Sequence, residues 1–117
     1  MKATAKTIKL GDLEITGLMS DEGLFGMSVI AFNDLLQFGV KGYNLQPIKR
    51  YFPDSIVNVV NWEVNGKSLM VLKSGDVDNL LWGLSMSRNQ IAQDILDVLN
   101  DNTITYILRR SFTPKIK

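Results

Sequence analysis

The fold is decided by residues 56–72, IVNVVNWEVNGKSLMVL. Two runs of β-branched and other apolar residues flank Asn65-Gly66 in this stretch. An Asn-Gly pair between such runs is the strongest short-range signal for a β-hairpin, because both residues tolerate the positive φ angles of the tight turn. The stretch therefore predicts two antiparallel strands joined by a two-residue turn.

Upstream of this hairpin, the pattern first predicts a strand. Leu13, Ile15 and Leu18 alternate loosely with polar residues, and Asp21-Glu22-Gly23 then predicts a turn. Residues 1–8 hold lysines and no acidic residue, which we interpret as a basic tail.

Two helices are expected next. Apolar residues recur at helical spacing over 29–38, and Gly39 follows at the position where a helix commonly ends. Asn44 can cap a second, shorter helix over 45–52. Because only residues 40–43 separate the two, they form a helix-turn-helix candidate.

The last third of the chain is predicted to be helical. Ser74 can cap a turn whose apolar residues lie over 77–84, and residues 87–90 fit a capping box ahead of a helix over 91–99. A final helical segment covers 104–110. The predicted fold class is thus α+β: a helix-turn-helix, a β-hairpin around Asn65-Gly66 and a helical C-terminal half.

Length and composition limit both the architecture and the chemistry. The chain has 117 residues, which predicts one small domain over 1–117, with basic tails at about 1–8 and 112–117. It contains no Cys and no His, which excludes disulfides, Cys/His zinc sites and imidazole catalysis. The N-terminus lacks an apolar signal region and no apolar run could cross a bilayer, so we expect a cytoplasmic protein without membrane contact.

The charges balance overall but are segregated along the sequence. There are 13 Lys+Arg against 12 Asp+Glu, yet 35–53 carries three cations and no acid, whereas 74–101 carries five Asp and one Arg. A basic helix face would attract nucleic-acid phosphates, although a solvated face is the simpler interpretation. On the second helix, Gln46 can share one side with either Lys49 or Arg50, as readout of a DNA groove requires. The candidate DNA-binding residues are Lys41, Tyr43, Gln46, Lys49, Arg50, Lys67, Arg109 and Arg110.

One pattern resembles a metal-dependent nuclease. Pro53-Asp54 precedes Glu63 and Lys67, but Glu63 and Lys67 are separated by the predicted turn, so the lysine would not lie beside the metal on the same strand. An ion pair between Glu63 and Lys67 across the hairpin is the preferred interpretation.

The remaining chemical groups also have structural interpretations. Asp94, Asp97 and Asp101 recur at helical spacing and indicate a solvated acidic stripe or a weak divalent-ion surface. Trp62 and Trp82 each stand among apolar neighbours and are predicted to lie in the core.

Several stretches resemble the amino-terminal domain of phage antirepressors and viral BRO proteins, a small α+β DNA-binding module. They are residues 32–39, 74–81, 91–96 and 107–110. Residues 26–52 are also similar to helix-turn-helix segments of uncharacterised bacterial proteins. The resemblance implies a transcriptional regulator or antirepressor of a phage or mobile element.

Taken together, these features predict a non-enzymatic DNA-binding protein that acts as a homodimer. No cofactor, metal or small-molecule substrate is expected. The alternative is a protein-binding inhibitor or adaptor that presents the acidic residues of 76–101 to a basic partner.

Overall fold

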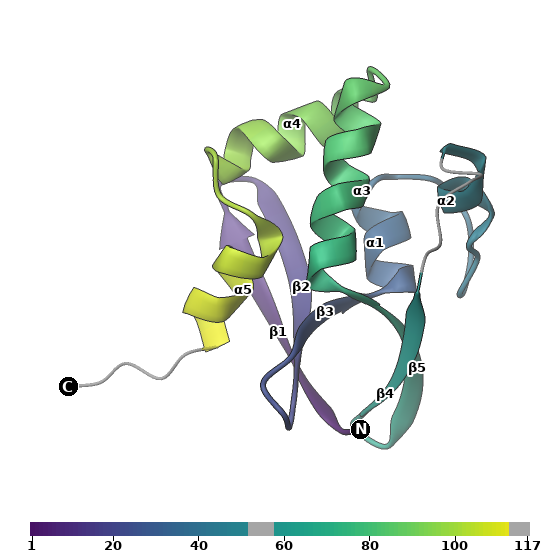
Figure 1. The fold of residues 1–117 in the computed structure, drawn as a ribbon, viewed down its shortest axis with the longest axis vertical. Coiled ribbons are helices and arrows are strands. Elements are labelled where there is room, and N and C mark those ends of the chain that lie inside the picture. The colour runs from purple at the N-terminus through teal and green to yellow at the C-terminus, as the bar shows by residue number, and fades with distance from the viewer. Residues whose placement is uncertain (52–57, 113–117) are drawn as a thin grey trace.

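The computed structural model describes residues 1–51 and 58–112, which form an α+β fold: a five-stranded antiparallel sheet with two short helices between its third and fourth strands, followed by C-terminal helices (Figure 1). The strand order in the sheet is β1-β2-β3-β5-β4. The elements are β1 (Ala3–Leu10), β2 (Leu13–Ser20), β3 (Phe25–Ser28), α1 (Val29–Leu35), α2 (Gln46–Tyr51), β4 (Val59–Val64), β5 (Lys67–Lys73), α3 (Ser74–Met86), α4 (Gln90–Leu99) and α5 (Ile104–Phe112).

The hairpin around Asn65-Gly66 is confirmed. Val64 pairs with Lys67, and Asn65 and Gly66 both have positive φ angles, 51° and 81°, as a type I′ turn requires. Glu63 pairs with Ser68 and therefore lies on the opposite face of the hairpin from Lys67. The expected ion pair between Glu63 and Lys67 is wrong for this reason.

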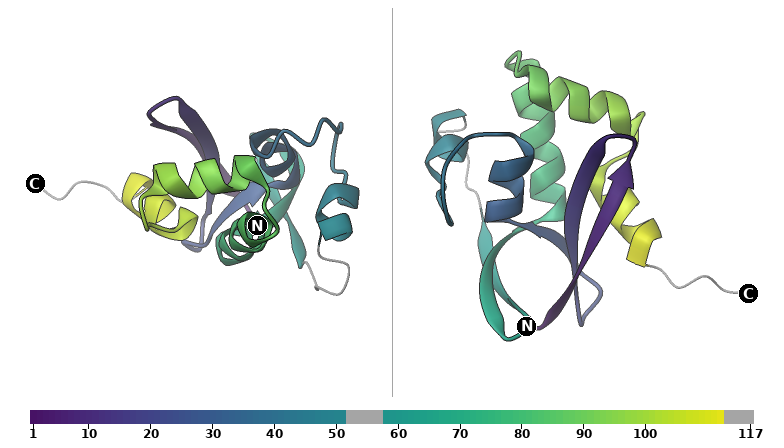
Figure 2. Two further views of the ribbon diagram at one scale, coloured as in Figure 1. Left: turned by 90° about the horizontal axis from the view of Figure 1, so that it is seen from above. Right: turned by 180° about the vertical axis from the view of Figure 1, so that it is seen from behind.

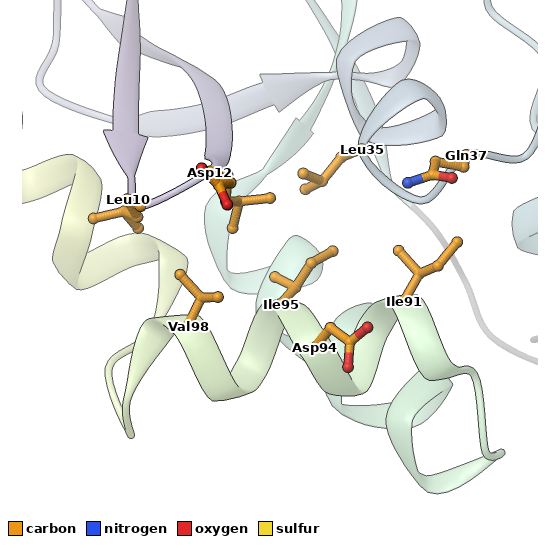
Figure 3. A pocket seen from close by; sticks show the side chains of 10 residues that line it. Leu10, Asp12, Leu35, Gln37, Ile91, Asp94, Ile95 and Val98 are labelled. Atoms are coloured by element: carbon orange, nitrogen blue, oxygen red, sulfur yellow. The ribbon is translucent and has the colours of Figure 1, made fainter.

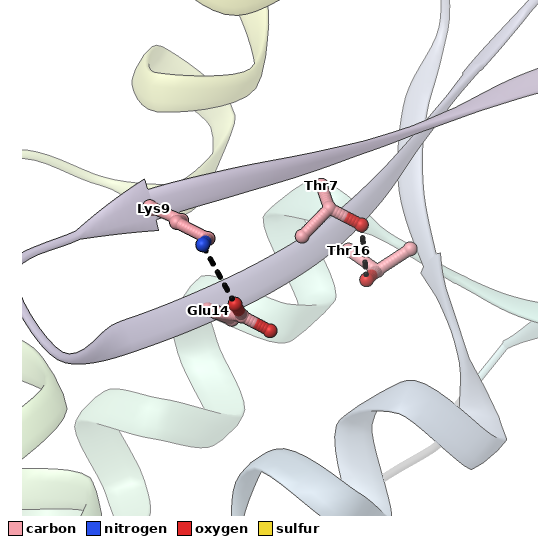
Figure 4. Close-up of polar contacts among 4 residues, drawn as sticks. All are labelled: Thr7, Lys9, Glu14 and Thr16. Atoms are coloured by element: carbon pink, nitrogen blue, oxygen red, sulfur yellow. Dashed lines mark hydrogen bonds and ion pairs between the residues drawn. The ribbon is translucent and has the colours of Figure 1, made fainter.

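The first ten residues contain a strand, so the predicted basic tail at 1–8 is wrong. β1 pairs with β2 along its whole length, through a two-residue turn at Gly11-Asp12. Across the exposed face of this pair, the hydroxyls of Thr7 and Thr16 lie 3.1 Å apart, and the Lys9 ammonium lies 3.5 Å from the Glu14 carboxylate (Figure 4). Backbone pairing holds this polar edge strand, which is why hydrophobic alternation did not reveal it.

The two faces of the sheet bury two separate sets of apolar side chains. On the helix-covered face, strand residues such as Met27 and Leu72 pack with all five helices. On the other face, the sheet curls until the Glu63 amide donates to the Met1 carbonyl at 2.8 Å. A second, smaller core lies inside this curl and consists of Leu18, Trp62, Val64 and Val71.

The two tryptophans have different environments. Trp62 is buried, as predicted, whereas Trp82 is 62% exposed, so its assignment to the core is wrong. The buried side of α3 is formed by Val77, Leu81 and Leu84, which recur at helical spacing, and Trp82 lies outside this stripe.

Helix α1 ends at Leu35, earlier than predicted. The amide of Phe38 donates to the Asn33 carbonyl, and that of Gln37 donates to the Asp34 carbonyl, both at 3.1 Å. This is a Schellman motif with Gln37, at φ 56°, in the left-handed position. The helix therefore stops before Gly39, where the sequence placed its end.

The start of α4 also differs from the prediction. Asn89 is its N-cap, and the Asn89 side chain accepts a hydrogen bond from the Ala92 amide at 3.0 Å, whereas Ser87 is the cap that the sequence predicts. Helix α4 ends at Leu99, as predicted, and its C-cap Asn100 is left-handed with φ 52°.

The start of α3 differs in a similar way, because Ser74 lies inside the first turn of α3 instead of capping it.

Helix α5 is held against the sheet and α3. The Asp78 carboxylate on α3 accepts hydrogen bonds from the Ile104 amide at 2.6 Å and the Thr105 hydroxyl at 2.7 Å, and so caps the free N-terminus of α5. Leu108 packs onto Gly17, where a Cβ would overlap its side chain. Phe112 is the last residue of α5 and contacts the ring of Phe25, so its assignment to the basic tail is wrong; residues 113–117 lie outside the described part.

We expect Gly26→Ala to destabilise the protein by about 2 kcal/mol, because overpacking a close-packed core has this cost. A Cβ at Gly26 would lie 2.7 Å from Val71 Cγ1 and 2.8 Å from the Leu72 carbonyl oxygen. Chemical denaturation followed by far-UV circular dichroism measures the change. The matched control is Gly75→Ala on α3, where a Cβ meets nothing within 4 Å. Equal stabilities of the two variants would contradict this packing.

We expect Asp78→Ala to lower the free energy of unfolding by about 2 kcal/mol, since it removes a charged cap and leaves orphan amides at Ile104 and Thr105. Asp97→Ala serves as the control, because it removes an exposed carboxylate that forms no hydrogen bond within residues 1–51 and 58–112. Hydrogen exchange should show faster exchange of α5 amides in the Asp78 variant. Unchanged protection of α5 would disprove the capping role.

Candidate functional site

Helix α2 and the segment before it are fixed to the body of the protein by three contacts. The Asn44 side chain caps α2 by accepting from the Gln46 amide at 2.9 Å. The buried Asn33 side chain on α1 donates to the Asn44 carbonyl at 2.8 Å. Ile48 is buried in the main core. These contacts set which side of α2 faces outward.

The outward side of α2 carries the polar residues that the sequence predicted. Gln46, Lys49 and Arg50 are all exposed, and their spacing places them on one side of the helix, away from Ile48. Lys41 is exposed in the segment before α2, whereas Tyr43 is half-buried and packs against the main core. We call Lys41, Gln46, Lys49 and Arg50 the α2 surface.

The connection between α1 and α2 differs from the predicted helix-turn-helix. It comprises ten residues, 36–45, whereas that motif has a turn of about three or four residues. The Schellman ending at Gln37 and the turns at Gly39 and Gly42, both at positive φ, account for the added length. The expectation of a tight turn is therefore wrong, and Phe52, the predicted end of the second helix, lies outside the described residues.

The other predicted DNA-binding residues lie away from the α2 surface. Lys67 follows the β4–β5 turn, at the end of the hairpin near the N-terminus (Figure 1). Arg109 and Arg110 are on α5, which lies on the opposite side of α3 from α2 in both views (Figures 1 and 2). The Arg110 guanidinium lies 5.8 Å from the centre of the Tyr106 ring. The eight predicted residues therefore do not form one surface.

The acidic residues of 76–101 differ in their surroundings. Asp78 caps α5, and Asp94 accepts a hydrogen bond from the Gln90 side chain at 2.8 Å. Asp97 and Asp101 are exposed. Within 1–51 and 58–112, no three acidic side chains come together as a metal site would need, and Asp54 of the nuclease-like pattern lies outside these ranges.

A groove of about 570 Å³ lies between α4, the C-terminal end of α1 and the β1–β2 turn (Figure 3). Its walls are apolar and are formed by Leu10, Leu13, Leu35, Ile91, Ile95 and Val98. Figure 3 shows the side chains of α4 pointing across the gap toward those of the strands and α1. Asp12, Gln37 and Asp94 add polar groups to its lining. Sequence reasoning missed this groove because three distant segments build it without a local motif.

Comparison with known proteins gives no match to a family model, to a curated protein or to a solved structure. No helix in the described part of the chain is long and apolar enough to cross a membrane.

Proposed function

We propose that this protein is a non-enzymatic DNA-binding module that contacts DNA through the α2 surface. The observation that carries the proposal is the exposure of Gln46, Lys49 and Arg50 on one side of a helix whose opposite side is anchored by Ile48. An amide and two cations on one helical side can combine base readout with phosphate contacts.

The dimensions and charge of this segment suit a DNA groove. Six helical residues extend about 9 Å, and the major groove of B-DNA is about 12 Å wide, so α2 can enter it end-on or lie within it. The sequence from Leu35 to Tyr51 contains three cations and no carboxylate. Phosphates approaching α2 therefore meet no repulsion from acids in the same segment.

Each residue of this segment has a distinct proposed role. Gln46 reads a base edge, Lys49 and Arg50 contact phosphates or bases, and Lys41 contacts the backbone beside α2. Tyr43 supports the segment through the core and can reach a phosphate with its hydroxyl.

A homodimer is part of the proposal, because one short helix with two cations, preceded by Lys41, gives few contacts and two copies on adjacent half-sites double them. The resemblance to antirepressor and BRO amino-terminal domains supports the same function. A regulator of a phage or mobile-element gene is the corresponding biological role.

We expect K41Q/K49Q/R50Q to reduce affinity for random duplex DNA and to flatten its salt dependence. Each phosphate contact contributes about 0.9 to the slope of log K against log salt, so loss of three contacts lowers the slope by about 2–3. Fluorescence anisotropy between about 50 and 200 mM salt measures this slope.

The control for this experiment is K2Q/K67Q/K73Q, which removes the same charge from exposed lysines outside the α2 surface. It should keep most of the slope. Equal losses in the two triple variants would show that binding follows net charge rather than the α2 surface. Absence of binding by the wild type at the lower salt concentration would overturn the proposed function.

A further inference from the structure

We propose that the groove between α4 and the β1–β2 turn binds a short segment of a partner protein that combines apolar residues with lysine or arginine. This site is separate from the α2 surface. The proposal rests on the shape of the groove, its apolar walls and the charge at its rim.

The walls of the groove are formed by partly buried apolar side chains that face each other across a gap, with the buried Ile95 at its base. Ile91 and Ile95 of α4 point toward Gln37 and Leu35 at the end of α1, and Val98 points toward Leu10 of β1, without closing the space (Figure 3). Val98, on the same side of α4, is 46% exposed. A volume of about 570 Å³ falls in the range of pockets that bind compact ligands. The groove can therefore take a few apolar side chains of a partner.

The rim of the groove carries two carboxylates that form no ion pair with any cation of residues 1–51 and 58–112. Asp12 lies on the β1–β2 turn, and Asp94 lies on α4 (Figure 3). Within the described residues neither forms an ion pair, and the one hydrogen bond of the Asp94 carboxylate comes from the neutral Gln90 amide. A lysine or arginine next to the apolar residues of a bound segment would complement both acids.

The polar group of Gln37 adds a third feature. Gln37 occupies the left-handed position that ends α1, where glycine is the usual residue, and its amide lies at the groove (Figure 3). A side-chain amide can both donate to and accept from the backbone of a bound peptide.

The same charges disfavour a second copy of this chain as the occupant. A symmetric contact through the groove would bring Asp12 and Asp94 of one protomer near those of the other, and like charges at an interface oppose association. We therefore assign the groove to a basic and apolar segment of a different protein.

The test is a selection of short random peptides displayed on phage against the immobilised full-length protein. We expect the enriched peptides to combine apolar residues with Lys or Arg. Synthetic, fluorescently labelled copies of them should bind wild type and lose about tenfold or more of their affinity for V98R, which fills the rim and repels cations. D12N/D94N should lose about three- to tenfold, in a salt-dependent manner.

The matched control is I30R, which adds the same charge at a partly exposed isoleucine of α1 that does not line the groove. I30R should bind the peptides like wild type, and V98R should bind DNA like wild type, so failure of this proposal is distinguishable from failure of the proposed function. Enrichment of acidic peptides, no enrichment, or equal peptide affinity of V98R and wild type would each overturn it. Concentration-dependent dimerisation of wild type that V98R abolishes would overturn it in favour of a second copy.

Discussion

The close approach of Trp62 to β3 is the contact on which the curled sheet depends. Gly26 has no side chain, so the indole and Val71 can pack directly over its backbone. This packing closes the second core on the face of the sheet opposite the helices. It also brings β4 near the N-terminus, where the Glu63 amide bonds the Met1 carbonyl. The outer strands β1 and β4 therefore lie close together on one side of the sheet. The helices pack against the opposite face, which carries Met27 and Leu72.

Helix positions on that face follow from a few specific contacts. Asp78 ties the start of α5 to α3, and Gly17 lets Leu108 sit against β2. A free helix N-terminus inside a protein must find acceptors, and here a carboxylate from another helix supplies them. Asp78 belongs to the acidic segment that the sequence suggested for binding a basic partner, yet its carboxylate caps α5. The positions of acidic residues in the sequence therefore do not by themselves define a binding surface.

Both proposed binding surfaces begin at the C-terminal end of α1. Asn33 holds the segment that leads to α2, while Leu35 and Gln37, two and four residues further on, line the groove. The Schellman motif fixes the direction of the chain at this point, because its two hydrogen bonds end the helix within one turn. A single short helix thus positions a basic surface on one side and an apolar groove on the other.

Local signals predicted the elements whose stability is local. The type I′ turn at Asn65-Gly66, the end of α4 at Asn100 and the exposed polar side of α2 follow from the preferences of the residues themselves. Where several nearby residues could cap a helix, the predicted helix end was displaced by a few residues. Asn89 caps α4 in place of Ser87, and the left-handed residue that terminates α1 is Gln37, although Gly39 follows it closely.

By itself, the sequence determined the α+β class, the β4–β5 hairpin and the exposed cations of α2, because short-range pattern and turn chemistry encode these features. Only the tertiary structure decided that residues 3–10 form an edge strand, that Trp82 is exposed and that Lys67 and Arg110 lie far from α2. The groove also belongs to this second group, since its walls come from three segments distant in sequence. The physical reason is that backbone pairing of a polar strand and packing between distant segments leave no periodic signal in the sequence.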